Sequence, residues 1–223
     1  MEATKKTNTK KKIIDDNTII SKYMEYVLEK NDEPKNVFSF CKENQINETE
    51  FYTFFNSLDS LKQQIWVKFF ENALETIHKE EAFEGYSDKN KLLTLYFTLF
   101  ELLTINRSFV MFSLKENKQG LKNLKNLKLF RNHFKNFIVT IIESESSAKN
   151  DKVAKVTKPI FAEGAWLQFL LLLKFWMEDT SKGFEKTDVL IEKSVNTVVD
   201  LLDTKPLESL FDLGKFLWKE KMN

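Results

Sequence analysis

The scarcity of helix-breaking residues is the feature that most constrains this chain. Its 223 residues include only five glycines and three prolines. That is too few for the many tight turns of a β-sandwich or a barrel, so long helices joined by short loops are expected. The 21 phenylalanines supply enough large apolar side chains to fill a helical core.

Charge is distributed unevenly along the chain. The formal net charge is +1, which gives the whole molecule no strong attraction to nucleic acid or membrane. Residues 1–14 carry five lysines against one glutamate, and we interpret residues 1–16 as a basic disordered arm. Cys41 is the single cysteine, which excludes an internal disulfide and fits a reducing compartment. The N-terminus lacks a secretory apolar run, so a cytoplasmic location is expected.

Apolar periodicity predicts an all-α fold, with an N-terminal three-helix module joined to a C-terminal bundle of about six helices. The polar run 144–158 is expected to be a flexible loop, and Pro159 to open the next helix. Asn47 and Glu50 stand at the spacing of a capping box. The helices are predicted at residues 17–30, 36–44, 48–55, 58–81, 91–104, 106–114, 121–143, 159–178, 184–203 and 206–221.

The first four of these helices have the lengths of a helix-turn-helix arrangement. Its central segment, Phe40 to Phe55, resembles the TetR/AcrR signature. Tyr52 and Phe55 match the Tyr-x-x-Phe end of the recognition helix, and Ile46 matches the apolar residue of the turn. The resemblance covers residues 17–75 and implies a helix-turn-helix domain at 17–60. It also implies a helical ligand-binding and dimerisation domain at 61–223.

Two departures from the family pattern bear on DNA binding. Gln45 replaces the turn glycine, so either Gln45 accepts a left-handed conformation or the turn is reshaped. Residues 31–61 contain six acidic residues and two basic ones, a net charge of −4. This charge opposes the phosphate neutralisation on which DNA binders depend. The basic arm compensates in part if it reaches phosphates or a minor groove.

The resemblance implies a ligand-responsive transcriptional regulator that binds operator DNA as a homodimer. The alternative for the recognition segment is a vestigial helix kept for packing, and for the arm a solvated tail. The residues expected to contact DNA are Lys10, Lys11, Lys12, Asn47, Thr49, Tyr52 and Thr53.

The resemblance further implies a cavity for a small apolar ligand inside the C-terminal bundle. Its expected lining is Phe97, Phe100, Met111, Phe112, Phe130, Phe134, Trp166, Phe169 and Leu170. In the family, the helices at 159–178 and 184–203 form the dimer interface. The candidates for that seam are Trp166, Phe169, Leu173, Val195, Val198 and Leu202. Plain core packing is the alternative for both sets.

A second resemblance lies near the C-terminus. The string 176–181, followed by Phe184, Lys186 and Thr187, looks like part of the lipid-binding proteins of ubiquinone biosynthesis. Those proteins share the TetR fold, are not known as DNA readers, and end in a membrane-touching amphipathic helix. An apolar face of this kind is offered here by Leu207, Leu210, Phe211, Phe216, Leu217 and Trp218. The alternative function is therefore a lipid- or partner-binding protein that does not bind DNA.

Catalytic motifs are missing from the sequence. It has no Gly-rich phosphate loop, no His-Glu metal spacing and no nucleophile elbow. His78 and His133 are isolated, and we expect surface or helix-end positions for them. Cys41 is expected to be a buried thiol, because the family has a small buried residue there. We expect no enzyme activity, no cofactor and no metal.

Overall fold

The computed structural model describes residues 14–115, 122–145 and 151–203. Within these ranges every regular element is a helix, so the predicted all-α fold is confirmed. The chain divides into two compact units. One groups residues 1–65 with 108–126, and the other groups 66–107 with 127–223.

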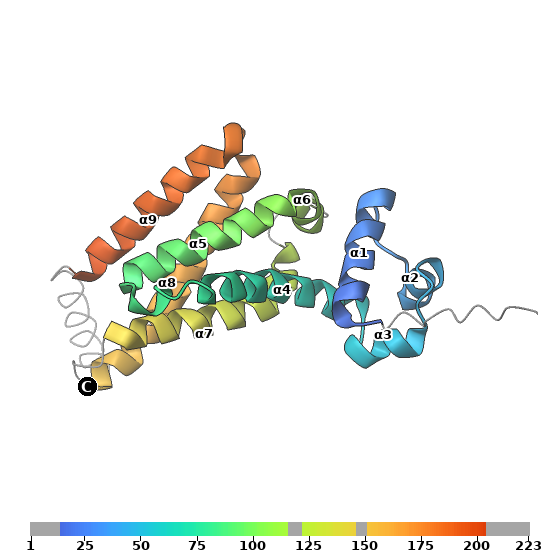
Figure 1. The fold of residues 1–223 in the computed structure, drawn as a ribbon, viewed down its shortest axis with the longest axis horizontal. Coiled ribbons are helices and arrows are strands. Elements are labelled where there is room, and N and C mark those ends of the chain that lie inside the picture. Colours follow the sequence, from blue (N-terminus) through green and yellow to red (C-terminus); the bar gives the residue numbers. More distant parts are fainter. Residues whose placement is uncertain (1–13, 116–121, 146–150, 204–223) are drawn as a thin grey trace, which may run out of the picture. The chain divides into compact units, whose positions relative to one another are not determined.

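The first unit contains the predicted helix-turn-helix. It is formed by α1 (Asp16–Lys30), α2 (Val37–Glu43), α3 (Glu48–Phe54) and the first turns of α4 (Leu58–His78) (Figure 1). Most of α6 (Arg107–Lys115) and a 3₁₀ turn (Lys122–Leu127) belong to it as well. Phe40 and Phe51 are completely buried and contact each other edge to face at 6.1 Å. This ring pair fixes α2 against α3.

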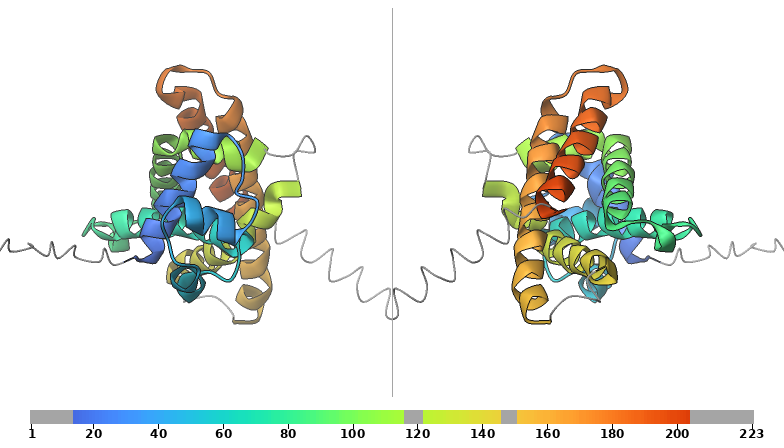
Figure 2. Two further views of the ribbon diagram at one scale, coloured as in Figure 1. Left: turned by 90° about the vertical axis from the view of Figure 1, so that its right-hand side faces the viewer. Right: turned by 90° about the vertical axis from the view of Figure 1, so that its left-hand side faces the viewer.

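The second unit is a helical bundle. It contains the rest of α4 together with α5 (Asp88–Ile105), α7 (Lys128–Glu145), α8 (Asp151–Glu178) and α9 (Glu185–Asp203). Helix α7 packs against α8, α5 packs against α7 and α9, and α8 packs against α9. Figure 2 shows α8 and α9 side by side, joined at one end by a short turn.

The observed helix ends agree with the predicted ones to within two residues except in four places, one of which is α5, which begins at Asp88 and not at residue 91. Residues 151–158 were predicted as loop but form the first turns of α8, and Pro159 lies inside that helix rather than at its start. That prediction is wrong because packing against α7 stabilises α8 as a whole, and Pro159 removes only one of its backbone hydrogen bonds. The single helix predicted at 121–143 is a 3₁₀ turn followed by α7, and α4 ends at His78. The predicted helix at 206–221 and most of the arm lie outside the described residues.

Candidate nucleic-acid interface and ligand-binding core

The turn between α2 and α3 has the hydrogen bonds of a Schellman motif. The Ile46 amide donates to the Cys41 carbonyl at 2.9 Å, and the Gln45 amide donates to the Lys42 carbonyl at 3.4 Å. Gln45 stands at the position where such motifs favour glycine, and its φ is 56°. Of the two alternatives for Gln45, the structure therefore has the left-handed residue in a preserved turn.

Helix α3 begins with the predicted capping box. The Asn47 side chain accepts a hydrogen bond from the Thr49 amide at 2.9 Å, and the Glu50 carboxylate accepts one from the Asn47 amide at 3.3 Å. The Glu50 carboxylate is therefore directed back along the helix terminus. One of the two acids of the recognition segment serves the local structure, which a charge count over the sequence does not reveal.

Lysine side chains connect the elements of the first unit. Lys62 of α4 bonds Glu33, in the α1–α2 loop, at 2.8 Å and Asp59 at 3.0 Å. Burial on its own lowers the pKa of the Lys62 ammonium, but its hydrogen bonds to Glu33 and Asp59 outweigh burial and raise it. Lys22 of α1 donates to the Asn44 carbonyl at 2.8 Å, at the end of α2. These bonds hold α1 and α4 at fixed places around the α2–α3 pair.

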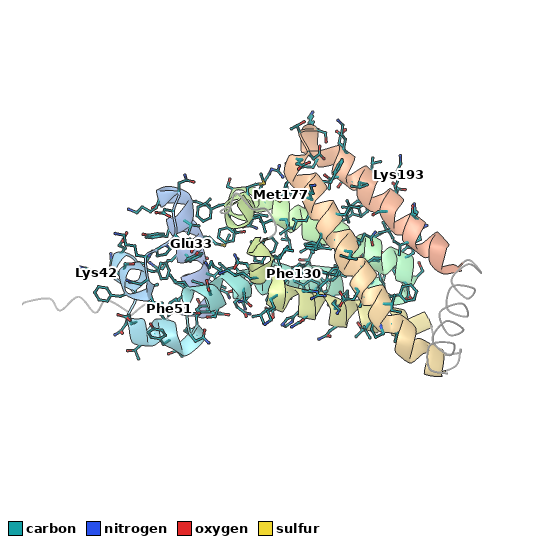
Figure 3. All side chains as sticks on the ribbon, turned by 180° about the vertical axis from the view of Figure 1, so that it is seen from behind. Glu33, Lys42, Phe51, Phe130, Met177 and Lys193 are labelled. Carbon is teal, nitrogen blue, oxygen red and sulfur yellow. The ribbon has the colours of Figure 1, made fainter. Side chains whose placement is uncertain are left out.

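Three predicted DNA-contacting residues of α3, at positions 49, 52 and 53, have the i, i+3, i+4 spacing of one helix face, and the fourth, Asn47, is the N-cap. Asn47, Thr49, Tyr52 and Thr53 are exposed, while Phe51 on the same helix is buried (Figure 3 labels Phe51). Thr53 donates its hydroxyl to the Thr49 carbonyl at 3.0 Å. This polar face can approach base edges or phosphates. Lys10, Lys11 and Lys12 lie outside the described residues.

The first unit also exposes aromatic rings that the sequence reasoning did not single out. Phe38 on α2 is 59% exposed and Phe54 on α3 is 42% exposed. The periodicity of short helices is a weak signal for such positions, because seven residues span only two turns.

Cys41 is buried as expected. It lies in the C-terminal half of α2, and its backbone carbonyl accepts the hydrogen bond of the turn residue Ile46. Burial raises the pKa of the Cys41 thiol to about 11, and the nearby Glu48 charge adds to this. The thiol is therefore protonated and unreactive at neutral pH.

Aromatic side chains fill the interior of the second unit. Phe130 of α7 lies at the centre (Figure 3), with ring centroids of Phe169, Phe70 and Trp166 at 5.0, 5.5 and 5.6 Å. Phe134 contacts Trp166 and Phe169 at 6.0 and 5.7 Å. We call Trp66, Phe70, Phe100, Phe130, Phe134, Trp166 and Phe169 the aromatic core; all are buried.

The structure brings together five of the nine residues predicted to line a ligand cavity: Phe100, Phe130, Phe134, Trp166 and Phe169. Phe97 is 39% exposed, and Leu170 is half-buried. Met111 and Phe112 belong to the first unit. The five grouped rings contact one another, so a ligand among them must replace ring contacts.

A row of buried polar groups lies beside the aromatic core, and sequence reasoning missed it. The Tyr96 hydroxyl is 3.0 Å from the Ala165 carbonyl and 3.3 Å from Gln168 Oε1, and Gln168 Nε2 donates to Ser194 Oγ at 2.9 Å. Burial raises the pKa of Tyr96 far above its usual value, so its hydroxyl stays protonated. The row connects α5, α8 and α9.

The α8–α9 pair has a buried and an exposed apolar face. Leu173 and Val195, predicted for the dimer seam, are 4% and 0% exposed within the single chain. Val198 is half-buried, and the Leu202 side chain lies outside the described part. Within 158–178, the part of α8 whose side chains are described, the large apolar residues that are exposed are Ile160, Leu167, Leu171 and Phe175, which we call the α8 stripe.

Segment Lys158–Glu178 of α8 is long and apolar enough to cross a membrane by length and composition, and 44% of its 18-residue apolar stretch is buried in the chain. The core helix of a bundle has the same properties. Its inner residues, such as Phe169 and Trp176, are fully buried. Packing in the chain therefore explains the buried apolar residues of α8, whereas the α8 stripe remains exposed.

The turn between α8 and α9 is organised by one carboxylate. Asp179 accepts hydrogen bonds from the amide and hydroxyl of Ser181 at 2.8 and 2.7 Å, and from those of Thr187 at 3.0 and 2.7 Å. Burial alone raises the pKa of Asp179, but these four donors outweigh it and lower the pKa to about 2. This carboxylate caps the start of α9.

The described part of the chain thus defines an all-helical protein with a helix-turn-helix unit and an aromatic-cored bundle. A family model of tetracycline repressor-like C-terminal domains matches residues 91–217, more than half of the chain. A search of curated proteins found no match. The chain belongs to the TetR-like family.

Proposed function

We propose that this protein is a ligand-responsive transcriptional regulator that binds operator DNA as a homodimer through α3. The observation that supports this most is the intact α2–α3 turn, which is followed by the exposed N-cap Asn47 and by an exposed face of α3 with Thr49, Tyr52 and Thr53. Two copies related by a two-fold axis would place their α3 helices in successive major grooves. A cytoplasmic location follows from this function.

The basic arm would supply the phosphate contacts that the first unit lacks. Residues 31–61 carry a net charge of −4, whereas Lys10, Lys11 and Lys12 belong to a segment of charge +4. Affinity dominated by a few lysines falls with rising salt in proportion to the phosphates neutralised. We therefore expect DNA binding that is tight only at low ionic strength.

The test is a fluorescence anisotropy titration at low salt with the DNA upstream of the protein's own gene and a scrambled duplex. We expect preferential binding to the upstream DNA. Thr53→Ala should weaken it, whereas Thr197→Ala should not. Thr197 is a fair control because it is also exposed and donates to the carbonyl four residues earlier. Equal, weak affinity for both duplexes would refute DNA regulation.

Dimerisation is proposed to use the α8 stripe. Leu167 and Leu171 are 64% and 57% exposed on successive turns of α8, and a two-fold interface is the commonest way to cover such a surface. Leu173 and Val195 would support the seam from inside. We expect Leu171→Glu to convert a dimer to a monomer in light scattering, while Lys128→Glu, at an exposed position of α7, leaves the mass unchanged.

The ligand is proposed to enter the aromatic core, where apolar rings surround Phe130 and the nearby Tyr96 hydroxyl is already hydrogen-bonded to Ala165. An uncharged, flat apolar molecule suits such a lining. Binding of 1-aminoanthracene, followed by its fluorescence, tests this. Phe134→Ala should change the affinity for the probe and Phe97→Ala should leave it unchanged.

The negative charge of residues 31–61 favours a second candidate, a lipid- or partner-binding protein that does not bind DNA. The amphipathic C-terminal residues invoked for membrane contact, such as Phe211, lie outside the described part. Liposome flotation that is lost in Phe211→Glu would favour this function. Preferential DNA binding without lipid binding would exclude it.

A further inference from the structure

Arg107 is the first residue of α6, and its side chain packs against the last turn of α8. Its guanidinium carbon lies 4.3 Å from the ring centroid of Trp176 and 4.5 Å from that of Phe184. Its Nη1 and Nη2 donate to the carbonyls of Trp176 and Met177 at 3.0 and 3.1 Å. The side chain therefore combines two cation–π contacts with hydrogen bonds to the last turn of α8.

We call Arg107, Trp176 and Phe184 the Arg107 cluster. Trp176 connects this cluster to the aromatic core. Its ring is completely buried and contacts Phe100 at 6.2 Å, and Phe100 contacts Phe169 at 6.0 Å. The indole Nε1 donates to the hydroxyl of Thr104 at 3.0 Å. Because Trp176 is held on several sides, a ligand that displaces Phe100 must move the indole or distort α8.

The other side of the cluster is strained. Gly183 and Phe184 have φ values of 63° and 62°. A left-handed conformation suits glycine but costs free energy for an aromatic residue, and it persists only where the surroundings enforce it. The left-handed conformation of Phe184 is held by the contacts of its ring with Arg107 and, at 6.0 Å, with Trp176. The hydrogen bonds of Asp179 at the start of α9 hold it further. Loss of the Arg107 contact therefore favours a different conformation of the turn.

The position of Arg107 in the chain gives the cluster its significance. Arg107 begins α6, and from Ser108 onward that helix is grouped with the unit that contains the helix-turn-helix. The contacts from Phe169 through Phe100 and Trp176 to Arg107 thus end where the chain passes from one unit to the other.

We propose that Arg107, Trp176 and Phe184 form a latch that holds the start of α6 in the ligand-free protein and opens when a ligand displaces Phe100 or Phe169. This inference rests on the proposed ligand-responsive regulator and names its coupling element. The closed latch corresponds to the DNA-binding state. Opening frees the first turn of α6 and weakens DNA binding.

The test compares Arg107→Lys with wild type by hydrogen exchange and mass spectrometry of the full chain. Lysine keeps the charge but cannot make the paired hydrogen bonds or stack its group between two rings. We expect amide exchange in α6 to accelerate at least tenfold while exchange in α7 is unchanged. Arg131→Lys is the matched control, because Arg131 is the chain's other arginine and pairs with Glu163 on the surface.

Thr104→Val is a second variant, which keeps the test decisive if Arg107→Lys does not fold. It removes the hydroxyl that orients Trp176 and keeps a similar volume, and we expect the same local acceleration in α6. Unchanged α6 exchange in both variants would overturn the latch. Equal acceleration throughout the bundle would also overturn it, because Arg107 would then be only a structural cap of α8.

DNA affinity, measured in parallel, separates the two proposals. If wild type binds its upstream DNA, Arg107→Lys should weaken that binding at least tenfold and Arg131→Lys should not. Unchanged affinity in Arg107→Lys would remove the regulatory role of the latch while leaving the regulator intact. Failure of wild type to bind DNA would refute the proposed function itself, and with it the role of the latch.

Discussion

Replacing Gln45 by glycine is expected to stabilise the helix-turn-helix unit. Gln45 has a φ of 56° in the Schellman motif that ends α2, and its side chain is exposed. A left-handed conformation costs an L-residue roughly 1–2 kcal/mol. Glycine avoids this cost but loses about 0.5–1 kcal/mol through the greater freedom of the unfolded chain. The net expected stabilisation is about 0.5–1 kcal/mol.

Hydrogen exchange of the α2–α3 amides in the full chain is the appropriate assay, because Trp66, Trp166 and Trp176 lie in the other unit and do not report on this one. Where exchange follows local opening, the expected stabilisation slows it roughly two- to fivefold. The amide of Ile46, bonded to the Cys41 carbonyl, reports most directly on the turn.

Gln45→Ala is the matched control for Gln45→Gly. Alanine also removes the side chain beyond Cβ but retains the cost of a positive φ, so its exchange rates should be equal to or faster than those of wild type. Equal slowing in both variants would mean that the Gln45 side chain, and not the backbone conformation, destabilises the turn. Faster exchange in Gln45→Gly would refute the conformational argument.

Three further predictions test the site and the core. Phe130→Ala should destabilise the bundle by about 3–5 kcal/mol, because Phe130 is buried among five rings. Phe97→Ala, at a partly exposed position, should cost less than about 1 kcal/mol. Urea denaturation followed by tryptophan fluorescence measures both free energies of unfolding. The pKa of Asp179, about 2 in the folded chain against an ordinary 3.8, means that its stabilising effect is complete at higher pH and is lost as pH falls through this interval. Thermal unfolding followed by circular dichroism should therefore lose less stability toward pH 2 in Asp179→Asn than in wild type. Glu48→Gln should raise low-salt DNA affinity roughly threefold in the anisotropy assay, because a carboxylate at the interface is neutralised; unchanged affinity would place Glu48 away from the DNA.

The local elements of the helix-turn-helix could be predicted from sequence because their determinants are short-range. The capping box of Asn47 and Glu50 depends on two residues three positions apart. The helical start of α8 could not be predicted in the same way. A polar segment followed by Pro159 has the sequence pattern of a loop. In the structure its backbone forms one continuous helix with the apolar residues that follow.

The side-chain grouping of the bundle needed the structure. Periodicity indicates that a residue is apolar and helical, but not which partner helix it faces. Leu171 and Leu173 are two positions apart in the sequence, yet Leu171 is exposed and Leu173 is buried. The row from Tyr96 to Ser194 spans three helices, and no spacing within one helix predicts it.

The C-terminal string that resembles lipid-binding proteins has a structural explanation. Asp179, Ser181 and Thr187 make the hydrogen bonds that cap α9, while Trp176 and Phe184 enclose Arg107. Each of these residues is thus required by the turn between α8 and α9, whatever the protein binds. The string is accordingly no argument for lipid binding over DNA binding. The charge and contacts of the first unit distinguish the two functions, and a direct measurement of DNA affinity tests them.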